Sequence, residues 1–215
     1  MAIPVMILGE SDTGKSASLR NFKAEEVAII DVSGKPLPFR NKLPILKTDK
    51  YDLITKAMLS RPNIPAFVVD DAQYLMANEF MRRSDERGYD KFTEIAKNFW
   101  SLIQETVSQR MPEKQIVYFL MHTDVSDDGR IRAKTIGKML NEKITLEGLF
   151  TIVLRTSVTD GVYSFRTVNS GSDTVKAPMG MFDAALIDND LKAVDTIIRE
   201  YYGFTEENKD KEKVA

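Results

Sequence analysis

The sequence predicts a single α/β domain with a mostly parallel five-stranded sheet that is flanked by helices and ends in an antiparallel hairpin. Five short apolar runs, separated by segments of helical spacing, are typical of strands buried on both faces. A glycine-rich loop directly follows the first run, and two acids close the third. The chain has 215 residues, of which 43% are hydrophobic and 29% charged, which suits one globular domain with a full core.

Composition excludes several kinds of chemistry. The chain has no cysteine and one histidine, which rules out disulfides and a cysteine nucleophile and leaves little material for zinc. Its net charge is −2, so nucleic acid would have to bind at a local basic patch. Because no apolar run approaches a membrane span and no signal pattern opens the chain, we expect a soluble, cytoplasmic protein with no membrane partner.

The first apolar run, residues 3–8, predicts a strand that leads into a P-loop, or Walker A, motif. Residues 9–16 read Gly-Glu-Ser-Asp-Thr-Gly-Lys-Ser, and residues 17–22 predict the helix that follows. In this pattern, backbone amides cradle phosphates, Lys15 reaches the outer phosphates and the Ser16 hydroxyl binds Mg²⁺. A glycine-rich turn alone would not need this strand and helix, so we expect ATP and Mg²⁺ as ligands. The expected nucleotide contacts are Gly9, Glu10, Ser11, Asp12, Thr13, Gly14, Lys15, Ser16 and Ala17.

The next two runs predict the second and third parallel strands. Residues 27–31 form the second, residues 32–50 predict a proline-rich loop, and residues 51–60 predict a crossover helix. The third run ends in Asp70 and Asp71. Terminal carboxylates of a strand are often merely solvated, but after a P-loop this pattern favours Asp70 as a Mg²⁺ ligand.

The fourth strand is predicted at residues 116–121, after an amphipathic helix over residues 91–110. Residues 78–90 fit either a mobile loop or a helical end. His122 follows the fourth strand, where polar side chains face the ligand crevice of such sheets. It is a candidate sensor of the terminal phosphate or a structural histidine that caps the strand.

A charged loop follows His122. A turn at residues 127–129 precedes three cations that form either a solvated loop tip or the best local basic patch for nucleic acid. These cations are Arg130, Arg132 and Lys134.

The last third of the sequence completes the predicted domain, residues 1–204. Helical structure is expected over residues 138–149, the fifth strand over 150–155, a hairpin strand over 161–168, and a final helix over 189–204 that Asn189 can cap. The charged residues 205–215 predict a disordered tail.

This order of elements resembles the RecA-like ATPases. The P-loop is similar to the Gly-Glu-x-x-Thr-Gly-Lys-Thr loop of eukaryotic and archaeal recombinases, and residues 30–34 resemble their Ile-Asp-Thr-Glu-Gly. Residues 67–76 and 174–182 look like small ATP-binding proteins that bacteriophages encode, often beside single-strand-binding and recombination genes. The likeness spans about residues 1–182.

The resemblance implies an ATPase of the AAA/RecA type that forms homo-oligomeric rings or filaments and couples the conversion of ATP to ADP to single-stranded DNA. It further implies a phage protein in the bacterial cytoplasm, with a single-strand-binding or recombination protein as a potential partner. His122 would be the sensor, residues 123–136 and 82–87 the DNA loops, and Lys176 a lysine finger that reaches the neighbouring subunit. Lys176 also fits an exposed lysine in a turn.

One departure concerns hydrolysis. Ser33 stands where the recombinases carry the glutamate that orients the attacking water, and Asp71 is the natural substitute, as in the acid pair of AAA-type enzymes. We therefore expect slow or assembly-dependent turnover. The alternatives are a nucleotide-switched loading module with little hydrolysis, or a P-loop kinase, against which the strand between the two nucleotide motifs argues.

Overall fold

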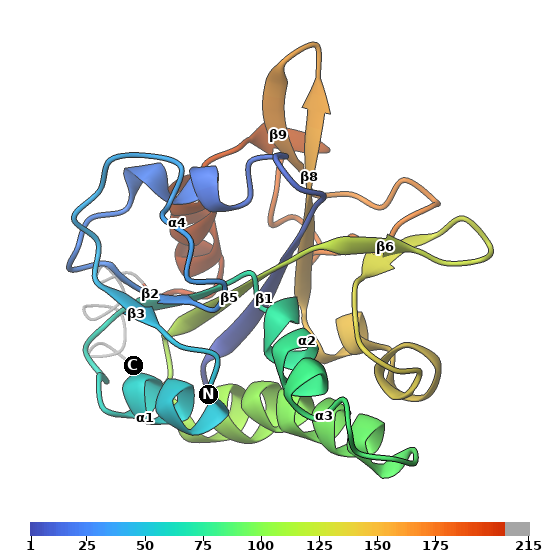
Figure 1. Cartoon of the computed structure of the whole chain (residues 1–215). Coiled ribbons are helices and arrows are strands. Elements are labelled where there is room, and N and C mark those ends of the chain that lie inside the picture. Colours follow the sequence, from blue (N-terminus) through green and yellow to red (C-terminus); the bar gives the residue numbers. More distant parts are fainter. Residues whose placement is uncertain (205–215) are drawn as a thin grey trace, which may run out of the picture.

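An eight-stranded sheet organises the chain in the computed structural model, which describes residues 1–204 apart from the side chain of Asn141 (Figure 1). The strand order is β10-β9-β8-β1-β5-β4-β2-β3. The strands of this sheet are β1 Ile3–Leu8, β2 Val27–Asp31, β3 Ile45–Lys47, β4 Ala66–Asp70, β5 Ile116–Met121, β8 Ile152–Thr159, β9 Val162–Arg166 and β10 Leu186–Asp188. A small antiparallel hairpin, β6 Thr123–Val125 with β7 Ile131–Ala133, stands apart from the sheet.

The sheet is mixed but mostly parallel, as predicted. All pairs from β8 through β1, β5, β4 and β2 to β3 are parallel, while β9 and β10 add antiparallel strands at one edge. The five predicted strands and the predicted hairpin strand are all present. The sequence nevertheless predicted too few strands for this sheet. β3 lies within the predicted loop 32–50, and β10 was not predicted. Each has only three residues and a partly exposed side-chain pattern, so neither produces an apolar run.

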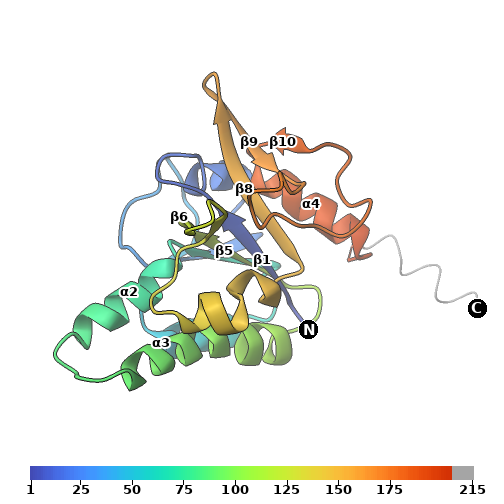
Figure 2. The same cartoon turned by 90° about the vertical axis from the view of Figure 1, so that its right-hand side faces the viewer.

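Helices cover both faces of the sheet (Figures 1 and 2). One face packs against α1 Tyr51–Leu59, α2 Gln73–Arg82, α3 Asp90–Ser101 and its π-helical continuation η2 Leu102–Arg110. The other face packs against the 3₁₀ helix η1 Ser16–Asn21 and α4 Leu191–Tyr201. Short helical turns η3 Met139–Ile144 and η4 Leu146–Leu149 precede β8.

Several predicted helix boundaries were wrong. Residues 78–82 form the end of α2 Gln73–Arg82, so the helical end offered for residues 78–90 is confirmed, but the start of this helix at Gln73 was not predicted. The helix after the P-loop is a 3₁₀ turn, and the predicted helix 91–110 becomes π-helical from Leu102. Asp190, not Asn189, caps α4, because its carboxylate accepts hydrogen bonds from the amides of Lys192 and Ala193. The predicted disordered tail, residues 205–215, lies outside the described residues.

The register of the parallel strands brings four chain segments to one edge. Leu8 at the end of β1 pairs with Met121 of β5 and with Arg155 of β8, and Asp31 pairs with Asp70 at the ends of β2 and β4. The loops that leave β1, β2, β4 and β5 therefore lie together at the carboxyl edge of the sheet. Over the described range, no helix is both long and apolar enough to cross a membrane.

Candidate nucleotide site

The P-loop joins β1 to η1 and leaves room only for glycine at its start. A Cβ on Gly9 would lie 1.9 Å from Thr156 Oγ1 and 2.6 Å from Thr13 Oγ1. These two hydroxyl oxygens are 2.6 Å apart, so β8 anchors the loop from the side. Asp12 and Gly14 have positive φ angles of 60° and 94°, which curl the loop tightly.

Lys15 lies curled inside this loop with 6% of its surface exposed. Its Nζ donates to the carbonyl oxygens of Gly9 at 2.9 Å and Glu10 at 2.6 Å. Burial lowers the pKa of Lys15, while the carboxylates of Asp71 and Asp70 oppose this shift. The ammonium group is thus placed to exchange two carbonyl partners for phosphate oxygens.

Ser16 and Asp70 meet at the foot of the loop. The Ser16 hydroxyl donates to Asp70 Oδ1 at 2.9 Å. Burial raises the pKa of Asp70 to about 6, although the hydrogen bond from Ser16 opposes the shift. A hydroxyl and a carboxylate are oxygen ligands of the kind Mg²⁺ prefers, and the ion commonly takes its other ligands from water and phosphates. No cluster of three His, Cys, Asp or Glu side chains within residues 1–204 could hold a metal by itself.

Asp31 also lies at this carboxyl edge of the sheet, although it belongs to neither of the two nucleotide motifs. Its Oδ1 accepts from the amide of Gly34 at 2.7 Å, whereas its buried Oδ2 has no hydrogen-bond partner among the described residues. It faces Asp70 in the register of β2 and β4 and raises the pKa of that carboxyl further. The signal available in the sequence was the acid that ends the second apolar run.

Asp71 and His122 form a pair beside the P-loop. His122 Nε2 lies 3.3 Å from Asp71 Oδ1, and Lys35 Nζ lies 4.0 Å from Asp71 Oδ2. Burial would raise the pKa of Asp71, but hydrogen bonds from His122 and Ser33 outweigh it and lower the pKa. β5 lies between β1 and β4, so His122 emerges between the P-loop and the acid pair. Asp71 also adopts a left-handed φ of 58°, which turns the chain sharply after β4.

A cavity of about 620 Å³ joins these groups, and we call it the P-loop cavity. Its volume lies within the range of small-molecule sites. Its acidic end is lined by Lys35, Asp71, Tyr74 and His122. The P-loop residues Ser11, Asp12, Gly14, Lys15, Ser16 and Ala17 line it too, and its far end is lined by Arg20, Tyr163 and Asn189.

Lys176 does not line this cavity. Its backbone pairs with Val153 through hydrogen bonds of 2.8 and 2.9 Å, two positions before the strand residue that pairs with Leu8. Its side chain is exposed, and partial burial lowers its pKa while Glu147 opposes the shift. Lys176 is therefore not among the residues that line the P-loop cavity of its own chain.

The predicted basic loop is the β6–β7 hairpin. It carries Arg130, Arg132 and Lys134, and the amide of Lys134 donates to the carbonyl oxygen of His122 at 2.9 Å. Arg132 lies 4.0 Å from Asp124 across the hairpin, so acids are interspersed with the cations.

The other predicted DNA loop, around residues 82–87, is held in ion pairs. Arg82 pairs with Asp49, and Arg83 contacts Glu86 at 2.7 Å and Glu94 at 2.6 Å. These pairs occupy two of the guanidinium groups that would contact phosphates, those of Arg82 and Arg83.

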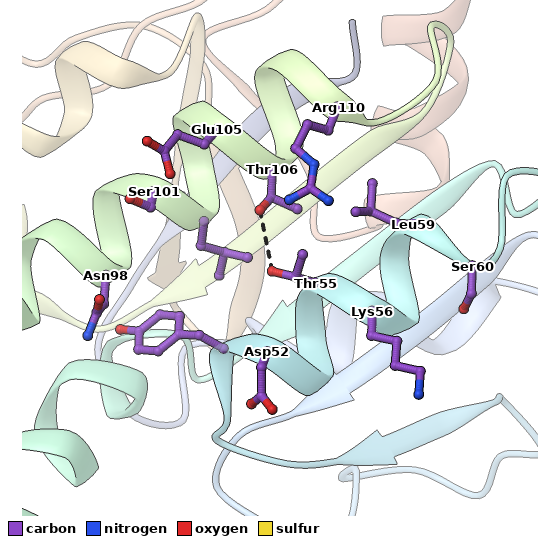
Figure 3. Close-up of a pocket in the computed structure, with 12 residues that line it drawn as sticks. Asp52, Thr55, Lys56, Leu59, Ser60, Asn98, Ser101, Glu105, Thr106 and Arg110 are labelled. Atoms are coloured by element: carbon purple, nitrogen blue, oxygen red, sulfur yellow. Dashed lines mark hydrogen bonds between the residues drawn. The ribbon is translucent and has the colours of Figure 1, made fainter.

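A second cavity, of about 720 Å³, lies between α1 and the α3–η2 helix (Figure 3). Thr55 and Thr106 are 3.3 Å apart across it. It shares no lining residue with the P-loop cavity and contains no predicted site residue.

Comparison with protein families and with curated proteins finds no relative: no family model matches the chain, and no curated protein matches it either. The fold and the site define an α/β protein with a P-loop motif at the carboxyl edge of a mostly parallel sheet.

Proposed function

We propose that the protein is a Mg²⁺-dependent ATPase of the RecA-like type, which converts ATP and water to ADP and phosphate. The observation that carries the proposal is the 2.9 Å hydrogen bond between Ser16 and Asp70. It joins the P-loop to the acid that ends β4, residues 54 positions apart in the chain. The acid pair is a weak signal by itself, and its contact with the P-loop is what a triphosphate site requires.

The residues divide the work along the P-loop cavity. Lys15 and the loop amides bind the triphosphate, while Ser16 and Asp70 hold Mg²⁺, which neutralises phosphate charge when bound. Asp71, kept ionised by its lowered pKa, accepts a hydrogen bond from the attacking water. His122, 3.3 Å from Asp71, orients that carboxylate and contacts the terminal phosphate.

Replacement of the P-loop lysine tests this function. Lys15→Ala removes the buried cation inside the loop, so ATP binding and hydrolysis should both be lost. Lys97→Ala, at an exposed position on α3, is the matched control and should hydrolyse ATP like the wild type. Equal rates in the two variants would contradict the proposal.

We further propose that single-stranded DNA stimulates turnover through the β6–β7 hairpin. The hairpin begins directly after His122 and returns to it through the Lys134 amide, so its position is linked to the acidic end of the cavity. Replacing Arg130, Arg132 and Lys134 together by glutamine should abolish stimulation by DNA and preserve the basal rate. Unchanged stimulation would refute the DNA assignment.

Assembly into a ring or filament accounts for the place of Lys176. Because this exposed side chain does not line the P-loop cavity of its own chain, a role for it at a triphosphate requires the cavity of a neighbouring subunit. Mixing Lys176→Ala protein with Lys15→Ala protein should then restore activity, since mixed contacts combine an intact P-loop with an intact Lys176. Absence of restoration in assembled mixtures would contradict this role.

A nucleotide-switched loading module with little hydrolysis is the second candidate. Two features favour it. The carboxylate of Asp71 already contacts His122 and Lys35, which compete with an attacking water, and Ser33 stands in the place of the recombinase glutamate. Tight ATP binding with negligible turnover at any DNA concentration would establish it. A P-loop kinase is the weakest alternative, and phosphate transfer to a nucleoside or nucleotide would revive it.

A further inference from the structure

The far end of the P-loop cavity is built from three separate segments. Arg20 comes from η1, Tyr163 from β9, and Asn189 from the turn between β10 and α4. None of them was predicted as a ligand contact. Gly14 lies against Asn189 and Tyr163, whereas Ser16 contacts Asp70, the neighbour of Asp71, so the P-loop runs from this end toward the acidic end. A triphosphate on the P-loop with its terminal phosphate at His122 would then point its nucleoside toward Arg20, Tyr163 and Asn189.

Asn189 has an unpartnered polar group at this end. The residue is only 4% exposed, and its Nδ2 has no hydrogen-bond partner among the described residues. Its side-chain oxygen faces the P-loop, since a Cβ on Gly14 would lie 2.9 Å from Oδ1. A buried amide without a partner is costly, and a ligand that supplies an acceptor removes that cost.

Two neighbouring bonds fix the position of Asn189 without using its amide group. Arg20 donates to the main-chain oxygen of Asn189 at 2.6 Å. Asn21 donates to the carboxylate of Asp190 at 2.7 Å, which ties η1 to the start of α4. These bonds hold Asn189 in place at the cavity, but neither gives its side-chain amide a hydrogen-bond partner.

Tyr163 supplies an aromatic surface next to this amide. A Cβ on Gly14 would lie 3.0 Å from Tyr163 Cδ1, so the ring and the amide contact the same point of the P-loop. The side chain is 43% exposed, which leaves part of the ring available to a ligand. Aromatic rings of this kind stack with nucleobases.

We propose that Asn189 and Tyr163 form the base subsite, which takes adenine in preference to guanine; this inference rests on the proposed ATP site. A side-chain amide offers one donor and one acceptor, which matches the N7 acceptor and N6 donor of adenine. Guanine presents two acceptors at the corresponding edge, so only the amide NH₂ finds a partner. Tyr163 adds stacking to either base.

The test compares ATP, GTP and inorganic tripolyphosphate, which lacks a base, by calorimetric titration. Asn189→Ala and Tyr163→Ala should each weaken ATP binding by about tenfold and leave tripolyphosphate binding unchanged. Asn189→Ala should also reduce the preference for ATP over GTP. Tyr202→Ala, which removes a partly exposed tyrosine that does not line the cavity, is the matched control and should change none of these affinities.

The outcomes separate this inference from the proposed function. ATP affinity at the wild-type level in both variants, or an equal loss of ATP and tripolyphosphate affinity, would overturn the base subsite. Failure of the wild-type protein to bind either ligand would overturn the proposed function itself. Tyr163→Ala decides the question if Asn189→Ala does not fold, because Tyr163 is partly exposed and tolerates truncation.

Discussion

The two ends of the P-loop cavity differ in how the chain builds them. At the acidic end, Asp71 and His122 follow the ends of β4 and β5, which are neighbouring strands of one parallel sheet. At the far end, Arg20 and Asn189 meet across 169 residues of sequence through the packing of η1 against α4. Asp71 and His122 at the acidic end pair with each other, whereas Asn189 Nδ2 at the far end, like Asp31 Oδ2 beside Asp70, has no hydrogen-bond partner among the described residues.

This contrast assigns a different task to each end. Groups fixed by strand register are held firmly, which suits the alignment of a reacting phosphate. The unsatisfied amide of Asn189, in the turn before α4, gains its bond only when a ligand arrives, which suits recognition. Changes at the acidic end should therefore lower kcat, and changes at the far end should raise KM.

The largest effect in this comparison is expected from Asp71→Asn. Asparagine tolerates the left-handed φ of 58° as well as aspartate does, so the substitution removes charge without adding strain. We expect kcat to fall by about a hundredfold or more, with ATP affinity retained. Steady-state kinetics and calorimetry measure the two quantities separately. A loss of affinity with unchanged kcat would reverse the roles of the two ends.

Gly9→Ala tests the anchoring of the loop between these ends. Its Cβ would lie 1.9 Å from Thr156 Oγ1, so the loop or β8 must shift, and we expect a loss of about 1–3 kcal/mol in stability together with weaker ATP binding. Gly148→Ala is the matched control, since no atom lies within 4 Å of its added Cβ and its φ is ordinary. Urea denaturation of both variants measures the difference. Equal stabilities would show that Thr156 does not confine the loop.

Asp70→Asn probes the acidic end in the absence of nucleotide and Mg²⁺. The pKa of Asp70 is about 6 in the folded protein against an ordinary 3.8, so the protonated form favours folding. That contribution is complete below about pH 4 and is lost as the pH rises through 6. At pH 8, asparagine should therefore stabilise the protein by up to about 3 kcal/mol, with little difference at pH 4. Urea denaturation at the two pH values checks this, and a difference independent of pH would contradict it.

The sequence predicts the acidic end better than the far end for a physical reason. Lys15 and Ser16 belong to one contiguous motif, and Asp70 and His122 end apolar runs whose register follows from parallel pairing. Tyr163 and Asn189 reach the cavity only because β9 and α4 dock beside the P-loop, which no local spacing encodes. Asn189 was predicted as a helix cap because asparagine is a favoured N-cap residue, but Asp190, one position later, offers the same chemistry and is the cap.

Asp190→Ala should have the smallest effect, and it tests whether the stability of α4 and ATP binding at the far end of the cavity depend on the same residue. The carboxylate caps α4 through the amides of Lys192 at 2.9 Å and Ala193 at 3.3 Å, and its loss should cost about 1 kcal/mol. Because Asp190 also accepts from Asn21, the same change should loosen Asn189 and weaken ATP binding about twofold to threefold, while tripolyphosphate binding stays constant. Thr196→Ala, an exposed position on the same helix, should alter neither quantity by comparison. Thermal denaturation and titration of the two variants measure these effects. A loss of stability without any change in ATP affinity would show that the base subsite does not depend on the docking of α4.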